Sequence, residues 1–248
     1  MISPTSLAGL ANLAGVAAAS AYRELLLAHD SIDRIWISQY ETPPSLQQRI
    51  QMTQFERDIV TVALEIREKA MIPFWEAVFA ACLRVGKCSE ALLSAASFHH
   101  GPGRLSLMSR DEVINDGLSK MTQSADVNTG LSSRVLLKSG EEVHLQMMDF
   151  RCDVSKENTR IVSAVCQRIM PGGSAVLDSG DSYHACGIVL VSASERVEFL
   201  AKSLLYAPIV DSVYVAHQLS QSASAIRISL GGTRKKTPTV LRMLLPES

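Results

Sequence analysis

Five residues with the chemistry of catalysis or ligand binding gather in the second half of the chain. They are Asp149, Ser182, His184, Asp211 and Arg227. Carboxylates that converge on one face of a sheet can hold Mg²⁺ or Mn²⁺, a histidine can contact a triphosphate, and an arginine can neutralise its charge. A site of this composition would support the metal-dependent joining of nucleotides.

The residues that follow Asp149 limit this hypothesis. Two acids at positions i and i+2 of a strand point to the same face, where they can share a metal ion. Position i+2 from Asp149 is Arg151, whose positive charge opposes metal binding. Asp153, at position i+4, shares the face only if the strand continues that far, and alternatively it caps the helix that follows. The candidate metal ligands are therefore Asp149, Asp211 and, in the first alternative, Asp153.

A basic run near the end of the chain is a second candidate for phosphate binding. Arg234, Lys235 and Lys236 follow Gly231 and Gly232. A glycine-rich turn with three cations can hold nucleic-acid phosphates through its amides and its charges. The alternative is a solvated hairpin tip, and the sequence leaves both interpretations open.

Aromatic residues of the first hundred positions have the spacing of core residues. Trp36, Phe74, Trp75 and Phe79 all lie in a region of helical periodicity. We therefore do not expect an aromatic platform for stacked bases in this part of the chain.

The elements that must position the candidate residues change along the chain. Residues 1–100 show helical periodicity almost throughout, which predicts an α-helical domain broken by two prolines at positions 43 and 44. Its clearest helices are predicted over residues 48–70, 74–85 and 89–98. Residues 101–142 mix Ser, Asp, Asn and Gly with short apolar runs, which predicts a linker or irregular connection.

From residue 143 onward the pattern alternates between strands and helices. Periodicity predicts two helices, over residues 156–170 and 193–205. Strands are predicted over residues 143–150, 175–177, 185–191, 213–215, 225–230 and 239–245. This order implies an α+β fold in which two helices pack on a sheet.

Composition excludes some classes of protein. A formal net charge of −1 and a pI near 6.6 argue against a broad positive face, so any nucleic-acid contact must be local. The five cysteines show neither CxxC pairing nor zinc-ligand spacing, and we interpret them as reduced core residues of a cytoplasmic protein. The apolar segment 7–21 lacks the basic start of a signal peptide and the length of a membrane span, so we expect a buried helix and no membrane association.

Three short motifs resemble those of the archaeo-eukaryotic primase superfamily, which includes the primase-polymerases. Ser182-Tyr183-His184 is similar to the Ser-x-His motif that the family places at a strand start, and Val210-Asp211 is similar to its hydrophobic-Asp motif. The stretch that ends at Arg227 resembles the family's basic residue before a strand. The sequence departs from the family's acidic first motif, because active members carry a second acid where this chain has Arg151.

The resemblance implies an RRM-like domain at residues 143–248 that binds nucleotides through Ser182, His184 and Arg227, and nucleic acid through the basic run. An active member would be a DNA or RNA primase-polymerase, with Asp149, Asp211 and His184 as catalytic residues and Mg²⁺ or Mn²⁺ as cofactor. Bacterial members often accompany antiviral defence systems. The rival hypothesis is a catalytically degenerate primase-fold subunit that binds nucleic acid or, through its helical half, a protein partner.

Overall fold

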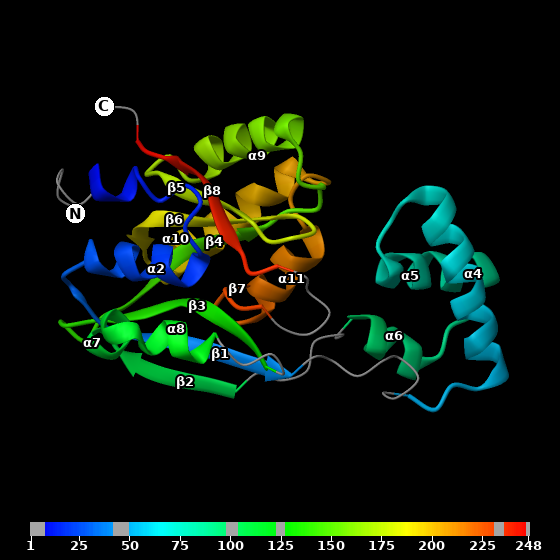
Figure 1. Ribbon diagram of the computed structural model, residues 1–248. Coiled ribbons are helices and arrows are strands. Elements are labelled where there is room, and N and C mark those ends of the chain that lie inside the picture. Colours follow the sequence, from blue (N-terminus) through cyan, green and yellow to red (C-terminus); the bar gives the residue numbers. More distant parts are fainter. Residues whose placement is uncertain (1–7, 42–49, 98–103, 123–126, 231–235, 247–248) are drawn as a thin grey trace. The chain divides into compact units, whose positions relative to one another are not determined.

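The chain folds into two compact units. The computed structural model describes residues 8–41, 50–97, 104–122, 127–230 and 236–246 (Figure 1). One unit comprises Met1–Glu41 and Gly103–Ser248, and the other comprises Thr42–Pro102. The second unit is therefore an insertion between two segments of the first.

The first unit is built on an antiparallel sheet of eight strands. Seven strands follow the order β2-β1-β3-β4-β6-β5-β8, and β7 pairs with β3. Their bounds are β1 (Ile32–Glu41), β2 (Arg104–Ser109), β3 (Val127–Leu137), β4 (Glu142–Asp149), β5 (Ser174–Asp178), β6 (Tyr183–Val191), β7 (Ala225–Arg227) and β8 (Thr239–Leu244). The sheet forks along β3, because residues 130–132 of this strand pair with β7 and residues 134–136 pair with β4.

Helices cover both faces of the sheet. They are α2 (Ala18–Leu27), α7 (Arg110–Glu112), α8 (Leu118–Met121), α9 (Lys156–Ile169), α10 (Ala193–Ser203) and α11 (Ser212–Ser220), with a π-helical turn at Val113–Gly117 and a 3₁₀ turn at Leu204–Tyr206. Side chains alternate between two cores, since successive residues of a strand point to opposite faces. Along β6, Cys186 and Ile188 pack into the core that contains α2. Tyr183 and Ala185 pack into the core formed with α9 and α10 (Figure 1).

Serine hydroxyls begin the two helices that were expected on this sheet. Ser155 accepts the N–H of Asn158 at the start of α9, and Ser192 forms a capping box with Glu195 at the start of α10. The cap of α9 is therefore Ser155 rather than Asp153. Strand β4 ends at Asp149, so the exposed Asp153 does not continue the face of the strand.

In the described part of the inserted unit, residues 50–97, the helices are α4 (Gln54–Ala70), α5 (Phe74–Val85) and α6 (Glu90–Ser97). They bury one small core, in which Ile59, Val78 and Leu92 are fully buried. Thr53 and Glu56 form a capping box that starts α4. These helices correspond to those expected over residues 48–70, 74–85 and 89–98.

The cysteines differ in part from the expectation that all five are reduced. Cys82 and Cys88 form a disulfide, with their Cα atoms 5.1 Å apart. The left-handed backbone of Gly86 ends α5 and turns the chain so that the two residues meet. Cys152, Cys166 and Cys186 are free thiols, and burial raises the pKa of Cys166 and of Cys186 to about 12.

The first 142 residues differ from the expected helical domain and linker. The region expected to be wholly helical contains β1, and the expected linker contains β2, α7, α8 and β3. Strand β1 forms because it pairs with β2 and β3, which are distant in sequence, and this pairing fully buries Ile35 and Ile37. Strand β3 buries polar residues such as Thr129 and Ser133, which bond to residues 224–229. The chain is thus divided at residues 41 and 103 rather than at 100 and 142.

The α+β class is confirmed by the mixture of helices and antiparallel strands. The RRM-like arrangement stays a prediction. No helix in the described ranges has both the length and the apolar character needed to cross a membrane.

Candidate functional site

Asp149 and His184 face each other on adjacent strands. They are register partners at the end of β4 and the start of β6. His184 Nε2 lies 3.7 Å from Asp149 Oδ1, a contact that becomes an ion pair when the imidazole is protonated. The imidazole is almost buried, with 8% of the residue exposed, whereas 30% of the Asp149 side chain is exposed. Both residues lie on the α2 face of the sheet, since they alternate with Met148 and Ala185 of the opposite core.

Asp211 is held beside Asp149 by the backbone. Its N–H donates to the carbonyl of Asp149 at 3.0 Å, and Phe150 forms a β-bridge with Val210. The Asp211 carboxylate caps α11, because its Oδ1 atom accepts the N–H groups of Val213 at 2.8 Å and Tyr214 at 3.0 Å. The strand expected over residues 213–215 is therefore wrong, since this cap starts a helix there.

Ser182 lies in a turn whose shape is fixed by its own hydrogen bonds. The N–H of Ser179 donates to the carbonyl of Ser182 at 3.0 Å, and the hydroxyl of Ser179 donates to the same oxygen at 3.0 Å. Gly180 adopts a φ of 107°, which favours glycine, and its N–H donates to Asp178 Oδ1. The turn leaves Ser182 half-exposed beside His184, which is two residues further along β6.

Arg227 holds this turn from β7. Its Nη2 atom donates to the carbonyl of Ser179 at 2.5 Å, and its Nη1 atom donates to the carbonyls of Ser229 and Lys236. Lys236 in turn lies 2.5 Å from Asp178 Oδ2. Arg227 is only 8% exposed, and these three bonds all go to backbone carbonyls. The structure thus joins Arg227 and Lys236 to the Ser182 turn, while Arg234 and Lys235 lie outside the described residues.

A family model covers the part of the chain in which these residues lie. The model described as archaeo-eukaryotic primase 1D-like matches residues 109–239, which is just over half of the chain. The chain belongs to this primase family. The match contains Asp149, Ser182, His184, Asp211 and Arg227, and it starts at the end of β2, well before the expected domain start at residue 143. No curated protein and no solved structure matches the chain.

The primase family implies a divalent metal, and the donor atoms around Asp149 do not fit a complete metal centre. Arg151 occupies the second acidic position, and its N–H donates to the carbonyl of Ile209. Asp153 is exposed beyond the strand, and Asp211 Oδ1 already accepts two backbone N–H groups. Within the part of the chain that is described, no three His, Cys, Asp or Glu residues form a group that could hold a metal ion.

The sequence patterns missed a buried polar group behind the acids. Tyr214, in the first turn of α11, packs against both cores. Burial raises the pKa of Tyr214 well above its ordinary value, and the negative charge of Asp149 raises it further. Next to it, the buried Arg196 of α10 donates to the carbonyl of Gln218 at 2.6 Å and to Ser224 Oγ at 3.3 Å. No motif marked these residues, because their meeting depends on how α10 and α11 pack.

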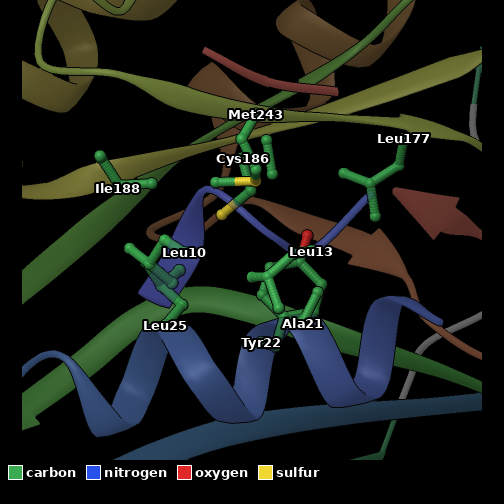
Figure 2. Close-up of a pocket in the computed structure, with 10 residues that line it drawn as sticks. Leu10, Leu13, Ala21, Tyr22, Leu25, Leu177, Cys186, Ile188 and Met243 are labelled. Atoms are coloured by element: carbon green, nitrogen blue, oxygen red, sulfur yellow. The ribbon is translucent and has the colours of Figure 1, made fainter. Parts of the chain in front are cut away.

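An apolar cavity lies on the same face of the sheet as the Asp149–His184 pair. Figure 2 shows its walls, which include Leu10 and Tyr22 on one side and Cys186 and Met243 on the other. Its lining side chains carry no charge, and the surface that they present to the cavity is wholly apolar. The cavity therefore lacks the cations that a nucleotide triphosphate would require.

Proposed function

We propose that this primase-family protein binds nucleotides or nucleic-acid ends without catalysing metal-dependent nucleotidyl transfer. The observation that carries the proposal is Arg151, a cation at the position where a second acid would complete a metal set with Asp149. Asp211 supports it, because its carboxylate stabilises the start of α11. The proposal corresponds to a catalytically degenerate primase fold that has kept its binding role.

Ser182 and His184 are the proposed phosphate contacts. The Ser182 hydroxyl is half-exposed at the turn, and an imidazole nitrogen of His184 can donate to a phosphate oxygen once a ligand displaces its contact with Asp149. Arg227 acts as a positioning residue, because its guanidinium donates to the carbonyl of Ser179 and so fixes the turn. Lys236 adds a cation at the same turn, and Arg234 and Lys235 of the same basic run are proposed as further phosphate contacts.

An active nucleotidyltransferase is the second candidate. It is favoured by the hydrogen bond from the Asp211 N–H to the Asp149 carbonyl, which keeps two acids adjacent beside His184. In that case these two acids would hold Mg²⁺ or Mn²⁺, and the metal would neutralise the phosphates during transfer.

Two measurements on the same preparation separate the candidates. Fluorescence anisotropy with a labelled nucleoside triphosphate and a labelled single-stranded oligonucleotide measures binding. Incorporation of nucleotides on primed and unprimed templates, with Mg²⁺ or Mn²⁺, measures transfer. We expect binding and no incorporation. Incorporation that is lost in both Asp149→Ala and Asp211→Asn would refute the proposal in favour of the enzyme, and the absence of any binding would refute both.

Matched substitutions test the binding residues. His184→Ala is expected to weaken nucleotide binding, whereas Lys202→Ala is the control. Lys202 is an exposed cation of α10 that pairs with Glu198 on the same helix. Equal loss of binding in the two variants would indicate a general charge effect and would exclude His184 as a specific contact.

A further inference from the structure

Strand β1 carries an aromatic side chain, Trp36, on the face of the sheet opposite the α2 core. In β1, Ile35 and Ile37 are buried in the α2 core, so Trp36 between them points to the opposite face. Leu105 and Leu107 of β2 are the register partners of Ser38 and Trp36 and share this face. Trp36 therefore belongs to a strand and not to the core of a helical region.

A cation packs against Trp36 on this face, and a second lies nearby on the same strand. The guanidinium carbon of Arg134, on β3, lies 4.5 Å from the centre of the indole ring. Glu142 holds this guanidinium through an ion pair of 2.5 Å, while about a third of the Arg134 side chain, 32%, stays exposed. Arg34, two residues before Trp36 and therefore on the same face, has 53% of its side chain exposed.

Solvent reaches the apolar residues of the same face. Leu105 is 60% exposed and Leu107 is 43% exposed. Helix α7 contacts β1 and is tied to the end of α2 by hydrogen bonds from Arg110, so it lies on the α2 face. Helices α10 and α11 pack on β4, further along the sheet (Figure 1). We call the surface of Arg34, Trp36, Leu105, Leu107 and Arg134 the Trp36 face.

We propose that the Trp36 face binds single-stranded nucleic acid, with bases stacking on Trp36 and the Arg134 guanidinium and with Arg34 contacting phosphate. An aromatic ring packed by a guanidinium on a partly exposed sheet face suits a single strand, because every base has a π-face and every linkage has a negative charge. Tyr40 lies on the same face four residues along β1, about 13 Å from Trp36 at the rise of a strand, which leaves room for neighbouring nucleotides.

This inference rests on the proposed nucleic-acid binding, but it assigns a second surface. Asp149 and His184 lie on the α2 face of the sheet, whereas Trp36 lies on the other face. We favour nucleic acid over a protein partner, because the Arg134 guanidinium lies on the indole ring, Arg34 is half-exposed two residues along the same strand, and the chain belongs to a primase family. A strand bound here would be held away from the Asp149–His184 pair.

The chain supplies its own optical probe, because Trp36 and Trp75 are its two tryptophans. In a Trp75→Phe variant, emission from Trp36 is expected to be quenched when oligo(dT) is added, since a stacked base quenches an indole. In a Trp36→Leu variant, emission from Trp75 is expected to stay constant. Stacking of a base on an aromatic ring predicts that Trp36→Leu weakens binding on the order of 5- to 100-fold.

Each result bears on a different claim. If the wild type binds the oligonucleotide without quenching of Trp36, and Trp36→Leu binds with unchanged affinity, then the Trp36 face does not bind nucleic acid. The proposed nucleic-acid binding elsewhere then stands, and a protein partner becomes the alternative occupant of this face. The absence of oligonucleotide binding by the wild type overturns both this inference and the proposed nucleic-acid binding. The quenching measurement keeps Trp36 in place, so it stays decisive even if Trp36→Leu fails to fold.

Discussion

Replacing Asp211 separates a structural role of this residue from a catalytic one. Its Oδ1 atom accepts the N–H groups of Val213 and Tyr214 at the start of α11, and the residue is half-buried. Removing an N-cap of this kind costs about 1 kcal/mol, with a range of roughly 0.5 to 2, so Asp211→Ala should lower the free energy of unfolding by about 1.5 kcal/mol because two bonds are lost. Asp211→Asn keeps a capping oxygen, and it should cost about 0.5 kcal/mol, which is the loss of the charge near the helix N-terminus.

Urea unfolding followed by circular dichroism measures both free energies, and nucleotide anisotropy measures binding in the same variants. The bond from the Asp211 N–H to the Asp149 carbonyl involves only the backbone, so both substitutions preserve it. We therefore expect Asp211→Asn to bind nucleotide as the wild type does. The reasoning is refuted if Asp211→Ala unfolds at the same urea concentration as the wild type. It is also refuted if the stable Asp211→Asn loses a metal-dependent activity, because a ligand role would then outweigh the cap.

Three further predictions concern stability. Burial lowers the pKa of His29 and of His144, so the unfolded state binds more protons than the folded state below pH 6.5. The free energy of unfolding should therefore be full above this pH and should decline as the pH falls through the lowered pKa values. Replacing both residues, His29→Gln with His144→Gln, should flatten the urea midpoint measured from about pH 7.5 to about pH 5. Arg227→Met removes charge-assisted bonds to three carbonyls and should cost about 2 to 4 kcal/mol in thermal or urea unfolding, whereas a change under about 0.5 kcal/mol would contradict its positioning role. Gly173 has a φ of 98°, and a Cβ there would lie 2.8 Å from the Leu244 carbonyl oxygen. Gly173→Ala should therefore lower the free energy of unfolding by at least about 1 kcal/mol. A variant as stable as the wild type by calorimetry would argue against this geometry.

Local patterns were sufficient wherever an element is defined by its own residues. Helix α5 coincides with the predicted residues 74–85, and α9 begins at Lys156 as predicted and ends one residue before the predicted end. Strand β6 begins with Tyr183-His184, in agreement with the expected motif at a strand start. In each case the periodicity or the cap lies within a few residues, so no distant partner is needed to determine the element.

Other elements were not predicted from the sequence, and some of them depend on hydrogen bonds to residues far away in the chain. Strand β3 carries buried Thr129 and Ser133, whose polarity disguises a strand until residues 224–229 supply their hydrogen bonds. Segment 213–215 is apolar enough for a strand, but the Asp211 carboxylate caps the backbone there and starts α11, which is a local signal that the apolar pattern outweighed in the prediction. The error at β3 arises instead because tertiary pairing overrides local propensity.

The sequence by itself determined which residue types could contact a nucleotide, and it determined that Arg151 interrupts the acidic motif, because residue identity and spacing along one strand are local properties. Only the tertiary structure decided what those residues do. It directs Arg227 to backbone carbonyls, and it uses Asp211 as a helix cap. It also places the half-buried Trp36 on the face of the sheet opposite the α2 core, since the burial of Ile35 and Ile37 fixes the direction of the residue between them.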